Sequence, residues 1–86
     1  MNLLLHRAEE FIKAVAITLP LLAKQPDLGR RRKFRNPSLR DLRSAQVGHP
    51  FQKILVFYRV TGNSLEAWRL LPGARNLSRR LVEPLP

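Results

Sequence analysis

The stretch KILVFYRVTGNSLEAWRLL, residues 53–71, decides the fold of this chain. Residues 53–60 are rich in β-branched and aromatic side chains and almost continuously apolar, which is typical of a central strand covered on both faces. Gly62 and Asn63 follow where a two-residue hairpin turn needs positive φ, and residues 64–71 are predicted as the returning strand. The stretch therefore predicts an antiparallel hairpin at the centre of a sheet.

An amphipathic helix is predicted upstream, over residues 4–23. Its apolar residues recur at helical spacing, namely Leu4, Ala8, Phe11, Ile12, Val15, Leu19 and Leu22. Pro20 removes a backbone donor and crowds the preceding turn, so we expect a kink or an early break within residues 16–19. The turn signals of residues 26–29, Pro-Asp-Leu-Gly, should end the helix by Gln25.

The basic segment RRRKFRNPSLRDLR, residues 30–43, permits two interpretations. Its cations far outnumber its one acidic residue, Asp41, and such runs are often solvated or flexible surface. The interleaved Phe34, Leu39 and Leu42 indicate instead a segment that is partly docked on the core and has a binding role. Both interpretations stay open at this point.

Three further boundaries complete the expected organisation. Residues 42–47 are predicted as a short strand, Pro72 ends the last strand because it cannot donate to a ladder, and residues 74–83 have helical potential, with Asn76 or Ser78 as a cap. The whole is expected to be one α+β domain: a helix at 1–24, a basic loop at 25–41, an antiparallel sheet at 42–71 and an exit segment at 72–86.

The bulk charge of the chain points to an acidic partner. In 86 residues, 16 Lys and Arg stand against 6 Asp and Glu, a formal net charge of +10. This excess attracts nucleic acid, a membrane surface or an acidic protein. Most of the cations are Arg, whose planar fork suits bidentate contacts with phosphate or carboxylate.

The residue inventory excludes several kinds of site. The chain has no Cys, which rules out disulfides, thiolate catalysis and Cys-based zinc sites. His6 and His49 alone make a metal site improbable, and we expect no cofactor. The apolar residues 3–5 are far too few for a signal segment, and no stretch approaches the roughly 18 apolar residues that cross a bilayer. A cytoplasmic protein without a membrane partner is expected.

No catalytic set is visible in the sequence, so catalytic residues remain unknown. There is no Gly-rich phosphate loop and no Ser/His/Asp or Cys/His set. His49, beside Pro50, is interpreted as a turn histidine, and Glu66 as an outward-facing charge with a cross-strand partner. Trp68 and Tyr58 either stack on bases or, as we favour, fill the core.

Arginines near the strand ends are the candidates for contact with an anionic partner. The candidate target-binding residues are Arg40, Arg43, Arg69, Arg75 and Arg79. If the basic segment packs against the sheet, Arg69 and Arg75 share an edge with Arg43 or Arg40. Arg59 and Arg69 have an alternative role as structural partners of a carboxylate or a helix C-terminus. If the ligand is a nucleic acid, the candidates are Arg31, Arg35, Lys53 and Arg59.

Residues 42–81 resemble the sheet and exit motif of the RelE/ParE superfamily of type II toxin-antitoxin toxins. The motifs that carry the resemblance are FYRV at 57–60, RLL at 69–71, GARNL at 73–77 and, upstream, LLAKQPDLGR at 21–30. The similarity extends over residues 9–82. It implies a RelE/ParE-like α+β fold, with an N-terminal helix packed on a small antiparallel sheet and a short C-terminal helix. It also implies a cognate antitoxin as partner.

The resemblance implies two alternative targets. ParE-like members inhibit DNA gyrase, whereas RelE-like members cleave mRNA in the ribosomal A site. A position that is often Arg in RelE-like chains is Ile54 or Leu55 here, and the late aromatic position falls near Leu81. None of these side chains can exchange a proton, while Arg75 matches the arginine shared by both branches. The ParE-like branch is favoured.

Two other functions stay open beside this one. In a ribosome-dependent mRNA endonuclease, Arg43, Lys53, Arg59 and Arg75 would stabilise the scissile phosphate. An inactive toxin remnant or a basic nucleic-acid-binding protein is the third alternative.

The sequence departs from the family pattern in two respects. Pro72 stands where the family commonly has His, and the usual N-terminal strand and first helix have no counterpart before the predicted helix. Exposed apolar surface and an open sheet edge would result, and such features invite pairing with another chain. We therefore expect either a homo-oligomer or dependence on the antitoxin.

Overall fold

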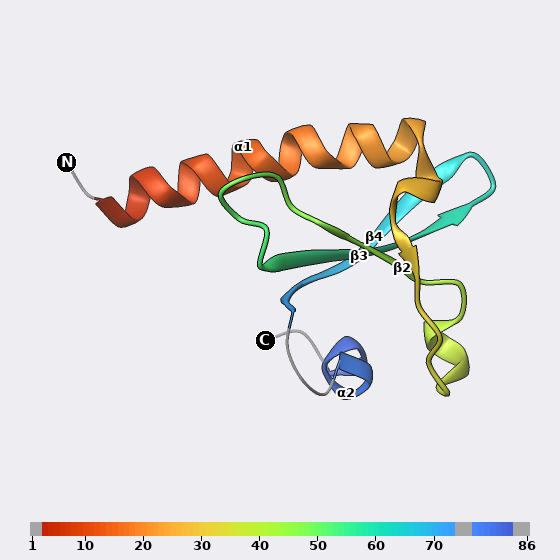
Figure 1. Cartoon of the computed structure of the whole chain (residues 1–86). Coiled ribbons are helices and arrows are strands. Elements are labelled where there is room, and N and C mark those ends of the chain that lie inside the picture. Colours follow the sequence, from red (N-terminus) through yellow and green to blue (C-terminus); the bar gives the residue numbers. More distant parts are fainter. Residues whose placement is uncertain (1–2, 74–76, 84–86) are drawn as a thin grey trace.

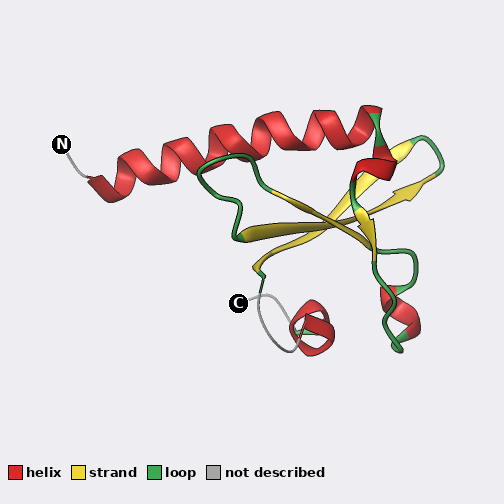
Figure 2. Cartoon of the chain, viewed as in Figure 1, coloured by secondary structure: helices red, strands yellow, loops and turns green. Residues whose placement is uncertain are grey.

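A four-stranded antiparallel meander forms the middle layer of the molecule (Figures 1 and 2). The computed structural model describes residues 3–73 and 77–83. In chain order the elements are helix α1 (Leu3–Lys24), the 3₁₀ turn η1 (Pro26–Leu28), β1 (Arg30–Arg31), the 3₁₀ turn η2 (Pro37–Leu39), β2 (Arg43–Gln46), β3 (Ile54–Thr61), β4 (Ser64–Pro72) and helix α2 (Leu77–Val82). The spatial strand order is the same as the chain order, so every connection between strands joins neighbours.

Helix α1 covers one face of the sheet (Figure 1). Its Leu22 packs with Val56 and Tyr58 of β3, and Leu19 lies against the same cluster. Of the kink or early break expected within residues 16–19, the break does not occur, because α1 continues through Pro20 to Lys24. Packing of Leu19 and Leu22 on the sheet offsets the loss of the backbone donor that proline lacks.

The second face of the sheet is covered by η2, the segment around it, and α2. Leu39, Leu42, Phe57, Leu71 and Leu81 are buried there, with Phe34, Leu55, Trp68 and Leu77 packed around them. The prediction of a central strand covered on both faces is confirmed. The basic segment is also docked on the core, since its Leu39 and Leu42 are almost completely buried.

The β3–β4 hairpin has the predicted two-residue loop, with Thr61 paired to Ser64. Gly62 has a φ of +61°, a conformation that suits glycine, and it is the turn position that needs this freedom. The register shifts by one residue between Phe57 and Tyr58, which inserts a β-bulge into β4.

The α+β fold class is confirmed: an N-terminal helix, a small antiparallel sheet and a short C-terminal helix. The segment expected to be a loop at 25–41 contains β1 and both 3₁₀ turns, which short-range patterns did not reveal. On α2, Leu81 is buried and Leu77 partly buried, whereas Val82 is exposed. Within residues 3–73 and 77–83, no helix has the length and apolarity that a bilayer crossing requires.

Candidate functional site

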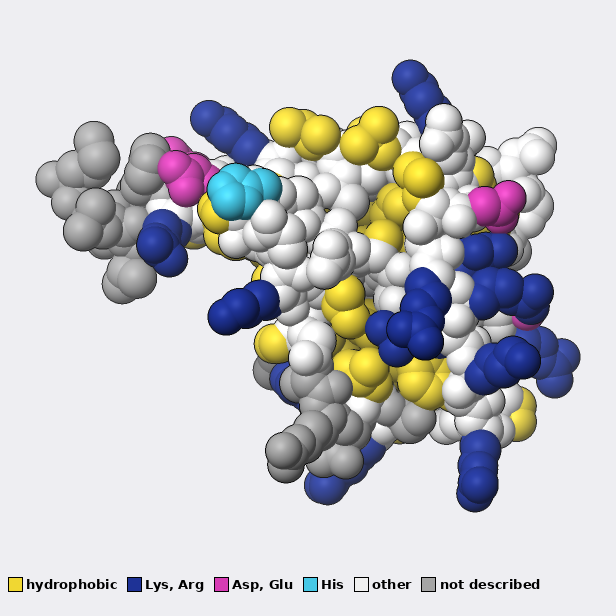
Figure 3. All heavy atoms as spheres, in the orientation of Figure 1, with side chains coloured by type: hydrophobic (Ala, Val, Ile, Leu, Met, Phe, Trp, Pro, Cys, Tyr) yellow, Lys and Arg dark blue, Asp and Glu magenta, His cyan; other side chains and the backbone are white. Residues whose placement is uncertain are grey.

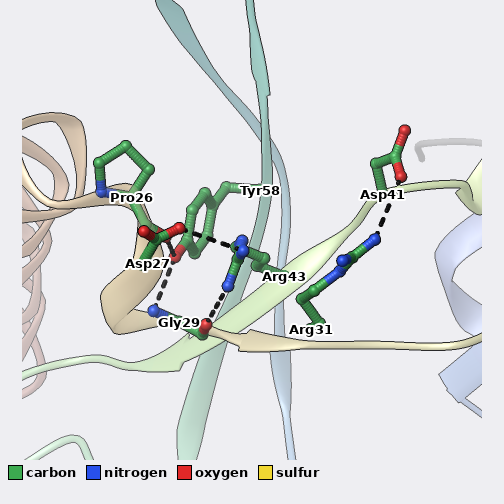
Figure 4. A network of polar contacts seen from close by, with 7 residues as sticks. All are labelled: Pro26, Asp27, Gly29, Arg31, Asp41, Arg43 and Tyr58. Carbon is green, nitrogen blue, oxygen red and sulfur yellow. Dashed lines mark hydrogen bonds and ion pairs between the residues drawn. The ribbon is translucent and has the colours of Figure 1, made fainter.

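The connection from α1 to β1 is held by the hydroxyl of Tyr58 (Figure 4). Tyr58 Oη donates to the carbonyl oxygen of Pro26 at 2.6 Å and accepts from the backbone N–H of Gly29 at 2.8 Å. Burial raises the pKa of this hydroxyl above its ordinary value, and the opposing effects of the Gly29 N–H and of Arg43 are smaller. Tyr58 thus belongs to the core, as favoured above, and fixes the position of β1 relative to β3.

Arg43 is the second anchor of the same connection (Figure 4). Its Nη1 donates to the carbonyl oxygen of Gly29 at 2.9 Å, and its Nη2 lies 3.2 Å from Oδ1 of Asp27. The side chain is about three-quarters buried, with 24% of its surface exposed. The structure therefore uses Arg43 internally, and contact of Arg43 with a target stays a prediction.

An apolar groove of about 460 Å³ lies beside this connection, between α1 and the first two strands. We call it the α1 groove, and its apolar lining includes Leu21, Leu22, Leu28 and Ala45. Leu21 and Leu28 are 54% and 59% exposed, and hydrophobic side chains crowd the solvent side of α1 (Figure 3). Among the residues that the structure describes, Arg30 is the one charged residue that lines it. Contiguous exposed apolar surface of this kind commonly marks a protein-binding site.

A second hollow, of about 330 Å³, lies where the chain passes from β1 to η2. We call it the cationic basin. Its charged lining residues are Arg31, Arg32, Lys33, Arg35, Arg40 and Asp41. Lys and Arg side chains gather on this side of the molecule, over the segment that joins α1 to β2 (Figure 3). Two distinct surfaces, one apolar and one cationic, thus meet along β1.

Two predicted target-binding arginines lie at α2 and have different surroundings. Arg69 donates through Nη1 to the carbonyl oxygen of Arg80 at 2.9 Å and through Nη2 to that of Glu83. It is a structural partner of a helix C-terminus, which was the alternative role considered for it. Arg79 is exposed on α2, with its Nε 3.9 Å from Oε1 of Glu83.

Arg59 is a structural residue on the same face of the sheet as α2. Its guanidinium lies 4.8 Å from the centre of the Trp68 ring, and Nη2 donates to the carbonyl oxygen of Ser38 at 2.8 Å. Its Nε is buried and has no hydrogen-bond partner among the described residues. Across the strands Arg59 faces Glu66, but Glu66 has no ion pair within the described part of the chain.

The predicted site residues therefore do not converge on one place. In the strand register Arg43 stands opposite Tyr58, whose side chain lies on the α1 face of the sheet. Arg69 stands opposite Phe57, whose side chain lies on the α2 face. The sheet separates them, so they do not share an edge. Arg31, Arg35 and Arg40 meet at the cationic basin, Lys53 lies exposed in the loop before β3, and Arg75 lies outside the described residues.

Sequence reasoning missed three features of this surface. Lys33 was not among the candidates, although its alternation with Phe34 signals an outward position. The α1 groove was not located, although Leu21 lies outside the apolar stripe that indicates the core face. The contact between Tyr58 and Gly29 spans 29 residues and leaves no local signal.

Comparison with known proteins agrees with this architecture. A family model described as ParE toxin of type II toxin-antitoxin system, parDE, matches residues 2–77. Searches of curated proteins and of solved structures give no significant match.

Proposed function

Because the chain belongs to the ParE toxin family of type II toxin-antitoxin systems, we propose that it inhibits a target protein, DNA gyrase, by binding it. A cognate antitoxin would neutralise it by docking in the α1 groove. The observation that carries this proposal is the groove itself, an exposed apolar surface on a chain whose family works through protein partners.

The groove suits an amphipathic antitoxin segment. Leu21 and Leu28 offer apolar contact area that protein interfaces use at their centres. Arg30 lines the groove, and the chain carries a formal charge of +10, so acidic side chains beside the apolar ones would be attracted. The expected occupant is therefore an apolar segment with carboxylates directed toward Arg30.

Binding is favoured over RNA cleavage by the positions of the basic residues. An endonuclease site would need Arg43, Lys53 and Arg59 around one phosphate. Arg43 lies on the α1 face of the sheet, and Arg59 on the opposite face against Trp68. Lys53 and Arg59 are six residues apart along an extended strand, about 20 Å. These three cations cannot hold a single phosphate, so ribosome-dependent cleavage is the weaker alternative.

Two cell-free measurements test the target. Purified chain is added to DNA gyrase with relaxed plasmid and ATP, and separately to a translation extract analysed by toe-printing. We expect loss of supercoiling and intact mRNA. New 3′ ends inside the A-site codon, with normal supercoiling, would establish the endonuclease instead. A folded chain that does neither would be an inactive remnant.

A matched pair of variants tests the α1 groove. Leu21→Glu places a charge in the groove, whereas Ile12→Glu changes a residue that is 65% exposed on the same helix. The two positions are nine residues apart, about two and a half helical turns, and so point to opposite flanks of α1. Each variant is co-purified with the product of the reading frame adjacent to the gene. We expect Leu21→Glu to lose the complex and Ile12→Glu to keep it; equal retention would place the antitoxin elsewhere.

A further inference from the structure

The cationic basin is a separate surface from the α1 groove, and neither the family nor the proposed function assigns it a ligand. We infer that it binds the phosphodiester backbone of a nucleic acid. The inference does not depend on gyrase as the target, because nucleic-acid binding by the free chain is measured without it.

Three cations of the basin, Arg31, Lys33 and Arg35, occupy alternate positions along the chain. From Arg31 to Arg35 exposure alternates: Arg31, Lys33 and Arg35 are exposed, whereas Arg32 and Phe34 are partly buried. Where a chain is extended, every second residue points the same way, about 7 Å from the last, and here the alternation continues past the end of β1 at Arg31 to the bend at Arg35. Successive phosphates of a nucleic-acid strand lie at a similar spacing, so the row can follow a backbone.

The inward residues hold this row in place. Nε of Arg32 donates to the buried Oγ of Ser44 at 2.7 Å, and the guanidinium lies 5.9 Å from the centre of the Phe57 ring. Phe34 packs against the core cluster on the same face. At the far side of the basin, Oδ1 of Asn36 accepts from the N–H and the hydroxyl of Ser38, which caps η2. The backbone of the site is thus held by fixed elements, so the cost of ordering on binding falls mainly on the exposed side chains.

The outward charges are available to a ligand. Lys33, Arg35 and Arg40 form no ion pair within residues 3–73 and 77–83. Arg31 lies 3.8 Å from Asp41, but both side chains are more than 60% exposed, and solvent screens such a pair strongly. One carboxylate therefore stands beside four outward cations, so the net charge of the basin attracts a polyanion.

A phosphate backbone fits the basin better than an acidic peptide does. Protein ligands usually gain affinity from a large apolar side chain seated in a pocket, with charges around it. In the basin the apolar residues are already committed to the core, since Leu39 is 1% exposed and Phe34 packs on the same cluster. Exposed apolar anchors occur instead at the α1 groove, where Leu21 and Leu28 lie.

The test compares two double variants that remove equal charge. Arg35→Ala/Arg40→Ala removes two cations from the basin, and Lys13→Ala/Lys24→Ala removes two exposed cations from α1. Binding to labelled duplex DNA of about 20 base pairs, and to RNA of the same length, is followed by fluorescence anisotropy between about 0.05 and 0.2 M salt. Poly-glutamate is added as a competitor that represents an acidic peptide. Circular dichroism confirms that each variant is folded.

We expect the basin variant to bind about tenfold more weakly near 0.15 M salt and to lose about two units of salt slope. The α1 variant should stay within about twofold, because neither lysine lines the basin and salt screens charges that do not contact the ligand. The DNA and RNA arms show which polymer is preferred. The inference is overturned if neither polymer binds, if both variants weaken binding equally, or if poly-glutamate displaces the nucleic acid at equal charge concentration. Failure to inhibit gyrase would leave these outcomes unchanged.

Discussion

Tyr58 lies so close to the backbone of Gly29 that a Cβ atom at position 29 would stand 2.1 Å from Tyr58 Oη. Gly29 has φ −78° and ψ 150°, a conformation open to any residue. It is therefore the space, rather than the backbone freedom, that requires glycine here. The Leu-Gly-Arg sequence at the end of η1 is shaped by a tyrosine that follows 29 residues later.

Gly29→Ala should lower the free energy of unfolding by about 2–3 kcal/mol, because Tyr58 must move and its two hydrogen bonds are disturbed. Urea denaturation measures the change. Gly48→Ala is the control, since its Cβ would meet only Thr18 Oγ1 at 3.9 Å, an ordinary contact. Equal stability of the two variants would show that Tyr58 can relax without cost.

Tyr58→Phe should cost about 1–3 kcal/mol at neutral pH, because the Gly29 N–H and the Pro26 carbonyl lose their partner. Burial raises the pKa of Tyr58 above its ordinary value of about 10. The neutral hydroxyl therefore stabilises the fold fully below about pH 10, and this contribution is lost as the pH rises through the folded-state pKa. The difference between wild type and Tyr58→Phe should shrink above pH 10. A difference in the free energy of unfolding that stays constant from about pH 8 to 11 would contradict this role of the neutral hydroxyl.

Arg69→Ala should loosen α2, because two carbonyl groups at its C-terminal end lose a charged donor. We expect a loss of about 1–2 kcal/mol and faster amide exchange in α2. Arg79→Ala is the matched control on α2. Its exposed pair with Glu83 should contribute less than about 0.5 kcal/mol. Similar losses in the two variants would count against Arg69 as a helix anchor.

Arg59→Ala should lower stability by about 1–2 kcal/mol through loss of the Trp68 contact and of the Ser38 hydrogen bond. Its affinity for duplex DNA should remain within about twofold of wild type, since Arg59 does not line the cationic basin. Thermal unfolding and anisotropy measure the two effects. A variant with normal stability and weak DNA binding would reverse this assignment.

Local patterns predicted the regular elements because those elements depend on neighbouring residues. The apolar run of β-branched and aromatic residues and the Gly62 turn located β3 and β4, and the helical period located α1. Of the kink or break considered before Pro20, the break does not occur, and local patterns could not show this because packing of Leu22 on Val56 and Tyr58 is a tertiary effect. Side-chain roles were harder still. Arg43 and Arg69 carry the same charge as Arg35, and only the folded chain shows that the first two bind backbone carbonyls while Arg35 faces solvent.

Exposed and partly buried side chains alternate from Arg31 to Arg35, so the side to which each residue points depends on whether its position in this segment is odd or even. Removal of one residue there would turn Lys33 toward the core and Phe34 toward water, whereas removal of two would keep each kind of side chain on its own side. We therefore expect this stretch to tolerate length changes of two residues better than changes of one.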